Sequence, residues 1–389
     1  MKKTPKLINF GRDRSFVSLF YVILSFLVAS ISAGINVVVF PAILIENNIG
    51  TFLTSLAVTS EMIFSLIAAL LVFKIILKFG ATRAVILTTL IYASITYFIF
   101  YYQNYLLWLI LQSTIGICWL FLYIIRQAWI NNLVSDRNRS IIVALISSIF
   151  CTGFVAGSSI VKIFGALNHT CLVISTAFII LAGILLLLTR GSFPETLDSD
   201  HVNIKMLIEK APNESLARFL LDFQAGCVIF LGVLFGTKIG LKAEDAGLLI
   251  AAFMASGILD LYAGVLAKYY DRTKLIAYAF FGCFLSFGTA IFFYQDFYIL
   301  MACFFCFGLA CAMIMVATLT NVNDKFDKSQ LVAANATFQA IGSLGTIIGC
   351  LVGGILMQIF GFYGFFATIL FAIVSYLVYF GYRSCHPEA

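Results

Sequence analysis

The chain has 389 residues, of which 62% are hydrophobic and only 11% are charged, and its mean hydropathy is +1.05. Soluble domains carry roughly 25% charged residues, and a water-soluble protein of this length needs more polar surface than these residues provide. The composition therefore excludes a soluble enzyme, a disordered protein and a nucleic-acid-binding protein.

The first apolar run follows a basic arm at residues 1–14 and extends from Phe16 to about Ile45. It is much longer than the roughly 7–15 apolar residues of a secretion signal. We therefore expect a membrane-spanning helix that is retained and not a cleaved signal peptide.

Twelve segments are long and apolar enough to span a membrane, which takes about 20 residues in a helix. They lie at residues 17–41, 52–76, 83–101, 105–128, 140–164, 170–188, 216–238, 246–267, 275–293, 297–319, 331–358 and 361–381. Pro41 is expected to end the first of them, because proline interrupts the hydrogen bonding of a helix. The predicted fold is an all-α membrane protein with twelve transmembrane helices in two six-helix bundles.

The placement of basic residues explains the net charge of +6 and predicts an orientation. With the N-terminus in the cytoplasm, 21 of the 24 Lys and Arg residues fall on the inner side, and only Lys162, Lys238 and Lys242 fall outside. Cytoplasmic loops of membrane proteins carry such an excess of positive charge. We therefore expect an integral protein of a bacterial inner membrane with both termini in the cytoplasm.

The longest polar stretch, residues 190–215, divides the chain into two halves. We predict an N-terminal six-helix bundle at 1–189, a cytoplasmic linker at 190–215 and a C-terminal six-helix bundle at 216–389. Within the linker, Ile204–Lys210 is compatible with a short amphipathic helix on the membrane surface and equally with a solvated connection.

The two halves share a weak internal repeat with an offset of about 192 residues. Gly153 and Gly157 correspond to Gly345 and Gly349, and a short basic turn follows the predicted segments 52–76 and 246–267. Transporters are commonly built from such duplicated units. The glycine pairs are interpreted as sites of close helix packing.

No enzymatic motif is found. The three histidines lie outside the predicted spanning segments, and Cys303-x-x-Cys306 has the spacing of a metal site but no histidine near it. Such buried cysteines are expected to pack as small apolar residues. We predict no catalytic residue, no metal site and no cofactor, and since no ATP-binding motif is present, any pumping must use a gradient.

Polar side chains inside the predicted spans are the candidate functional residues, because they are costly in lipid and need a reason to be there. The candidates for substrate or proton binding are Asn36, Glu61, Gln112, Asp222, Gln224, Asp260, Asn335 and Gln339. Glu61 is the first choice, since burial favours the neutral form of a carboxyl group and allows proton uptake near neutral pH.

Each candidate also has a structural interpretation. Glu61 can be a protonated carboxyl group hydrogen-bonded to a neighbouring helix, and Asp222 can pair with Arg218 one turn earlier. Asp260 can pair with the basic turn that follows it, and the amides can join helices. Arg126 is expected to reach toward the lipid headgroups.

Four predicted segments, 83–101, 170–188, 275–293 and 361–381, contain no internal charged or amide residue. We expect these helices to face lipid. The first, second, fourth, seventh, eighth and eleventh segments are expected to line a central path.

Three regions resemble the major facilitator superfamily and, within it, the YcaD-like transporters. They are residues 123–131 followed by Asn138-Arg139-Ser140, residues 238–247 with 264–272, and residues 321–324 with 331–335. The resemblance implies a two-bundle transporter that works by alternating access.

The resemblance also assigns gating loops. In the first loop Gly80 and Arg83 match the family pattern and Lys78 replaces its arginine, whereas in the second loop Gly264, Asp271 and Arg272 are kept. Gln112 stands where proton-coupled drug exporters have an arginine, which argues against a drug–proton antiporter.

The function expected from these observations is secondary transport of a small solute, most simply coupled to protons, by a monomer surrounded by lipid. An uncoupled facilitator of the same fold is the first alternative. A transporter-derived membrane sensor or assembly protein is the second, although the loop at 190–215 is small for one. A membrane enzyme acting on lipid-linked substrates would need clustered acid, base or metal ligands, which the sequence lacks.

Overall fold

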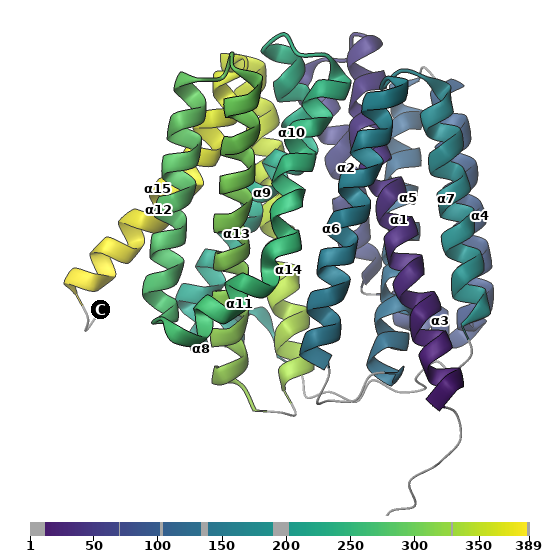
Figure 1. The fold of residues 1–389 in the computed structure, drawn as a ribbon, viewed down its shortest axis with the longest axis horizontal. Helices are drawn as coiled ribbons and strands as arrows, with labels where there is room; N and C mark the ends of the chain where they lie inside the picture. Colours follow the sequence, from purple (N-terminus) through teal and green to yellow (C-terminus); the bar gives the residue numbers. More distant parts are fainter. Residues whose placement is uncertain are drawn as a thin grey trace, which may run out of the picture.

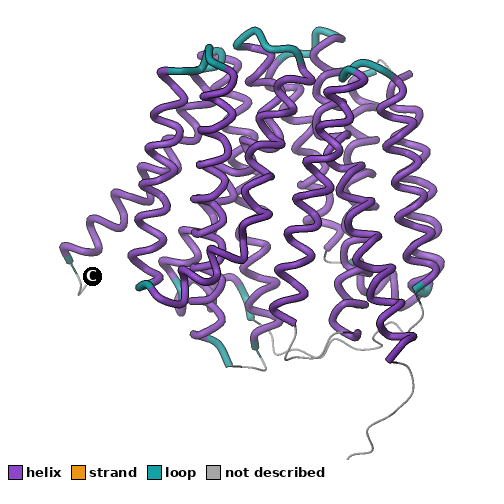
Figure 2. Tube along the Cα trace, in the orientation of Figure 1, coloured by secondary structure: helices purple, strands orange, loops and turns teal. Residues whose placement is uncertain are grey.

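The computed structural model describes residues 12–69, 71–101, 104–133, 139–189, 202–327 and 330–386. Within these ranges every regular element is a helix (Figure 2), and the helices run side by side with their loops gathered at two opposite ends. The basic arm at 1–11 and most of the proposed linker fall outside the described residues.

The helices fall into two groups along the chain. The first group comprises α1 (Arg12–Glu46), α2 (Thr51–Ala69), α3 (Val72–Phe79), α4 (Ala81–Phe98), η1 (Ile99–Tyr101), α5 (Tyr105–Leu133), α6 (Arg139–Phe164) and α7 (His169–Leu188). The second comprises α8 (Ile204–Lys210), α9 (Pro212–Lys238), α10 (Ala243–Ala255), η2 (Ser256–Leu259), α11 (Asp260–Tyr269), α12 (Arg272–Phe292), α13 (Phe297–Lys325), α14 (Leu331–Phe360) and α15 (Tyr363–Cys385). In Figure 1 the first group, purple to teal, lies beside the second, green to yellow.

Eleven helices of the described chain are long and apolar enough to cross a membrane. The remaining predicted span, 246–267, is made by α10, η2 and α11 in sequence, none of which is long enough alone. The all-α, twelve-span fold is confirmed, and the protein is an integral membrane protein.

One predicted boundary is wrong, and two predicted spans are not continuous α-helices. Pro41 lies inside α1, which continues to Glu46, because the following turn is held by its own bonds, as between the Asn47 amide and the Ile43 carbonyl (3.1 Å). The segment 52–76 ends as a helix at Ala69 and resumes as α3 at Val72. The segment 246–267 tightens into the 3₁₀ turn η2.

The glycine pairs of the repeat make equivalent helix contacts in the two halves. A Cβ at Gly157 would lie 2.1 Å from the Ile31 carbonyl oxygen of α1, and one at Gly349 would lie 2.3 Å from the Phe223 carbonyl oxygen of α9. Only glycine therefore allows α6 to approach α1, and α14 to approach α9, so closely.

The two halves are joined mainly at one end of the molecule. We call this the outer end, after the predicted orientation; it holds the α1–α2, α6–α7 and α9–α10 connections. There the Phe52 amide donates to Gln358 Oε1 (3.3 Å) and Ser55 Oγ donates to the Cys350 carbonyl oxygen (2.7 Å). Lys162 pairs with Asp245 across α6 and α10 (2.6 Å).

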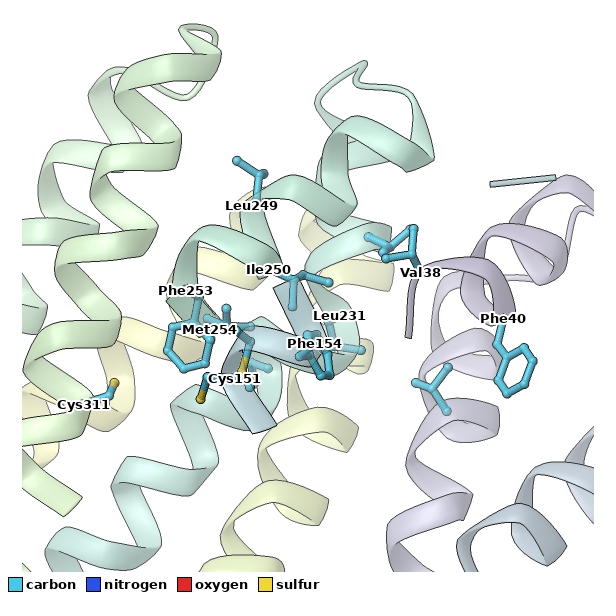
Figure 3. Packing of buried hydrophobic residues seen from close by; sticks show 14 of the residues in the cluster. Val38, Phe40, Cys151, Phe154, Leu231, Leu249, Ile250, Phe253, Met254 and Cys311 are labelled. Atoms are coloured by element: carbon cyan, nitrogen blue, oxygen red, sulfur yellow. The ribbon is translucent and has the colours of Figure 1, made fainter. Parts of the chain in front are cut away.

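Apolar packing between the halves continues inward from the outer end (Figure 3). Phe154 and Cys151 of α6 lie among Ile250, Phe253 and Met254 of α10. All five side chains are buried. This packing brings α6 and α10 together at the boundary between the two halves.

Of the two interpretations left open for Ile204–Lys210, the structure has the helix, α8, with the same bounds. The Asn203 side chain caps it by accepting from the Met206 amide (2.8 Å). Leu207 is buried in a small cluster with Val322 of α13 and Phe338 of α14. One face of α8 is therefore packed on the second half of the chain.

Candidate functional site

A cavity of about 250 Å³ lies between the two halves. Its walls come from α1, α2, α4, α5 and α6 of the first half and from α9, α10 and α14 of the second. Most of the lining side chains are aromatic or aliphatic, and the polar ones are Asn36, Glu61, Tyr92, Gln112, Asp222 and Thr346.

Four of the eight candidate residues thus line one cavity, although they are far apart in the sequence. Asn36 comes from α1, Glu61 from α2, Gln112 from α5 and Asp222 from α9. The packing of the two halves brings them together, and they remain candidates for the binding of substrate or protons.

Asn36 is held in a chain of hydrogen bonds at the cavity wall. Its Nδ2 donates to the Tyr92 hydroxyl oxygen (3.2 Å), and its Oδ1 accepts from Ser175 Oγ (2.7 Å). Ser175 is in turn 2.8 Å from Ser32 Oγ. This network joins α1, α4 and α7 and fixes the direction of the Asn36 amide.

Glu61 has a different environment. Its side chain is half-buried at the cavity, and within the described chain its carboxyl group has neither a hydrogen-bond nor an ion-pair partner. Gly116 of α5 packs against the same turn, since a Cβ there would lie 2.0 Å from the Glu61 carbonyl oxygen. The backbone of Glu61 is therefore tightly positioned while its carboxyl group is available.

Gln112 lies on α5 one turn before Gly116. Its side chain is 1% exposed, and its Oε1 atom has no hydrogen-bond partner among the described residues. A buried amide group normally satisfies its hydrogen-bonding capacity. Gln112 thus lines the cavity, while its Oε1 atom is enclosed by protein atoms.

Asp222 is neutralised by a neighbour on its own helix. Arg218 Nη2 lies 2.8 Å from Asp222 Oδ2, and Arg218 also donates to Gln339 Oε1 of α14. Both charged groups lie over Gly342, where a Cβ would be 2.0 Å from Asp222 Oδ2. The structural interpretation of Asp222, an ion pair with Arg218, is thus realised at the cavity edge.

The other four candidates lie away from the cavity. Gln224 is fully buried, with Nε2 directed at Cys283 Sγ of α12 (3.9 Å). Asp260 accepts a hydrogen bond from Ser147 Oγ of α6 (2.8 Å) and forms no ion pair within the described chain. Gln339 is exposed and contacts Arg218, and Asn335 Oδ1 is buried without a partner among the described residues.

Arg126 corrects an expectation. It is 1% exposed and does not reach the lipid headgroups. Its Nε donates to Ser25 Oγ (3.0 Å), and its guanidinium lies over the rings of Phe26 (5.4 Å) and Trp119 (5.8 Å). The rings and the hydroxyl group hold the charge inside the first half, because a guanidinium tolerates aromatic contacts better than an ammonium does.

The expected gating loops differ in how they are anchored. Asp271 caps α12 by accepting from the Lys274 amide (3.1 Å), and Arg272 pairs with Asp324 of α13. Gly264 falls within α11.

In the first loop Gly80 has a positive φ of 83° between α3 and α4, a conformation that favours glycine. Lys78 lies over the Phe79 ring (5.5 Å), and Arg83 is exposed. Unlike Arg272, neither Lys78 nor Arg83 forms an ion pair with a neighbouring helix among the described residues.

Several cavity residues were missed from the sequence, namely Tyr92, Trp119, Phe150, Phe154, Phe230 and Thr346. Tyr92 lies in a segment expected to face lipid, although it is only 4% exposed. Its hydroxyl group was a usable signal, since a phenol within an apolar span needs a hydrogen-bond partner. The phenylalanines carry no such signal, because they suit a lipid-facing surface equally well.

Comparison with known proteins agrees with this architecture. The chain is 24% identical to an uncharacterized MFS-type transporter, YfkF, of Bacillus subtilis (strain 168), over 66% of this chain and 68% of that protein. Among solved structures it is similar to the nucleoside transporter NupG, with a TM-score of 0.78, 12% identity and coverage of 96% and 99% of the two chains.

It is also similar to a bacterial homologue of the human lysosomal transporter Spinster in an inward-facing and unoccupied conformation. That match has a TM-score of 0.72 and 13% identity, and it covers 95% of this chain and 96% of the other. The sequence model of the Major Facilitator Superfamily matches residues 22–202 and 215–388. The chain therefore belongs to the Major Facilitator Superfamily and is a membrane transporter, not an enzyme.

Proposed function

We propose that this transporter moves a small molecule by alternating access and that proton binding at Glu61 drives the movement. The observation that carries the proposal is the position of Glu61 between the two halves, where its carboxyl group has no partner within the described chain. Intramembrane carboxyl groups without a structural role commonly mark proton or substrate pathways.

Alternating access requires contacts that can break as the halves rock about the central site. The outer end has such contacts: a salt bridge between Lys162 and Asp245, and single hydrogen bonds from Ser55 and Phe52 to α14. Their combined strength is modest, because exposed ion pairs contribute little. In the proposed cycle they close the outer end in this conformation and separate in the opposite one.

The proposed setting is a bacterial inner membrane, with both termini in the cytoplasm and the chain acting as a monomer. The excess of basic residues on one side supports this orientation. To test this orientation, exposed Lys238 and Glu209 are each replaced by cysteine, and the two variants are labelled from opposite sides of sealed vesicles.

Transport in proteoliposomes tests the proton role. A solute is first found by screening metabolites for ligands that raise the melting temperature of the purified protein, which binding to the folded state does by mass action. We expect Glu61→Gln to abolish accumulation driven by a proton gradient and to retain exchange of labelled for unlabelled solute when the solute is supplied at a saturating concentration.

The matched control is Glu209→Gln, the same change on the exposed face of α8. There the ion-pair partner of Glu209 is Lys205 (3.8 Å). Normal uphill accumulation by Glu61→Gln would refute the proton role. Wild-type uptake that is unchanged when the gradient is collapsed would favour the uncoupled facilitator.

A further inference from the structure

The described residues that line the central cavity include aromatic and acidic side chains but no basic ones. The lining includes the aromatic side chains of Phe40, Trp119, Phe150, Phe154 and Phe230. It also includes two carboxylates and no lysine, arginine or histidine among the described residues that line it. Aromatic faces and carboxylates both attract cations.

The acceptor groups at the cavity are not equally occupied. Asp222 is paired with Arg218 at 2.8 Å, so its charge is already compensated. Glu61 has no partner in the described chain, and Gln112 Oε1, on a side chain that is 1% exposed, has none either. The cavity therefore has one uncompensated carboxyl group, that of Glu61.

Positive groups on the neighbouring helices do not supply the missing charge. Arg218 of α9 is bound to Asp222, and α14, which packs against α2, has no charged residue. Arg126 of α5 is absent from the lining and follows Gly116, which packs on Glu61, by ten residues. At a rise of 1.5 Å per residue it is displaced from that contact by about 15 Å along the helix.

Helix α1 does not supply a positive charge to Glu61 either. The described side chains of α1 include one charged residue, Glu46, which is exposed at the outer end. No described positive side chain on α1, α5, α9 or α14 meets Glu61, so a proton or a cationic group of the transported molecule is left to neutralise it.

We propose that the cavity selects a small organic amine in its ammonium form, with an aromatic or aliphatic body. The proposal rests on the proposed function, in that it takes this cavity as the transport site. The ammonium group binds Glu61, and the body packs on the phenylalanine rings.

The size of the cavity limits the ligand. Its volume of about 250 Å³ lies below the roughly 300–1,000 Å³ typical of pockets for drug-sized molecules. An anion would meet the Glu61 charge unfavourably, and a neutral molecule would leave that charge buried without compensation. An amine and a proton compete for the same carboxyl group, because each neutralises it.

Three ligands with the same phenylethyl body separate these possibilities. Calorimetric titration of the purified full-length protein with 2-phenylethylammonium, 2-phenylethanol and 3-phenylpropanoate varies only the charge of the end group. We expect saturable binding of the ammonium compound, at least tenfold tighter than that of the other two. Its affinity falls as the pH is lowered, because protons and the ammonium group compete for Glu61.

The variants then locate the interaction. Glu61→Gln weakens ammonium binding at least tenfold, Glu61→Asp retains part of it because the charge is kept, and Glu209→Gln binds as the wild type does. Equal or tighter binding of the alcohol or the carboxylate, unchanged binding by Glu61→Gln, or no saturable ammonium binding up to 10 mM (about 2.7 kcal/mol) would each overturn the proposal.

Failure here is distinguishable from failure of the proposed function. Proton-driven uptake of an anion would overturn the substrate class and leave the coupling role of Glu61 intact. Tight ammonium binding at Glu61 together with uptake that ignores the proton gradient would support the substrate class and refute the coupling.

Discussion

In the second half of the chain the guanidinium group of Arg218 is paired with Asp222, whereas Arg126 in the first half has Ser25 and two aromatic rings as its neighbours. Both side chains are almost fully buried, at 5% and 1% exposure. The second half therefore uses its carboxylate to compensate its arginine. The first half compensates its arginine without a carboxylate and leaves Glu61 available at the cavity. The two halves thus differ in what their carboxyl groups contact: Asp222 is held in an ion pair, and Glu61 has no partner within the described chain, as its proposed role requires.

The largest expected effect comes from breaking the compensated pair. Arg218→Met leaves Asp222 charged and partly buried, and the loss of one partner of such a pair destabilises by about 3 kcal/mol. The apparent melting temperature of the purified protein measures this loss. Arg218→Met combined with Asp222→Leu recovers most of it, since no lone charge remains. Equal stability of the single variant and the wild type would contradict the structural role of the pair.

Arg126→Met sharpens the contrast with a smaller loss. It removes the bond to Ser25 Oγ and the contacts with Phe26 and Trp119, but it leaves no unpaired carboxylate behind. We expect a loss of about 1 to 2 kcal/mol, typical of a hydrogen bond that involves a charged group. The same melting measurement, made beside Arg218→Met, checks the order. A larger loss for Arg126→Met would mean that the first half also has a compensating anion.

The smallest effect is expected at the outer end. Lys162 and Asp245 are 43% and 25% exposed, so Lys162→Glu weakens the contact between the two halves by less than about 1 kcal/mol. Amide hydrogen exchange of α10 near Asp245 should then be faster at low salt and much less affected at high salt, which screens exposed charges. The charge-swapped pair Lys162→Glu with Asp245→Lys should restore slow exchange. Unchanged exchange in the single variant would show that the pair does not hold the outer end closed.

Much of the fold was predictable because the bilayer imposes a length and a polarity on each span. Twelve apolar segments predicted twelve spans, and the glycine pairs at 153/157 and 345/349 predicted close helix packing that both halves show. The turn at Leu71 was not predictable, because it lies in an unbroken apolar run. The 3₁₀ turn at Ser256–Leu259 had a signal that the prediction missed, since a Ser-Gly pair is a common site of helix kinks.

The candidate site was predictable only in part. Residue type and depth selected Asn36, Glu61, Gln112 and Asp222, all of which line the cavity. The same reasoning selected Gln224, which is equally polar and equally deep but faces α12. Two residues along a helix separate Asp222 from Gln224, a rotation of about 200° at 3.6 residues per turn.

By itself the sequence determined the helical class, the number of spans, the expected orientation and the short list of costly polar groups. These follow from local composition, because apolar length and the placement of basic residues act on each segment separately. Only the tertiary structure decided which polar groups meet. Lipid and neighbouring helices both present apolar surfaces to a span, so its sequence does not show which face is turned inward. The rotation of each helix about its own axis places Glu61 and Gln112 at the cavity and Arg126 among aromatic rings. It also brings Asp260 within hydrogen-bonding distance of Ser147.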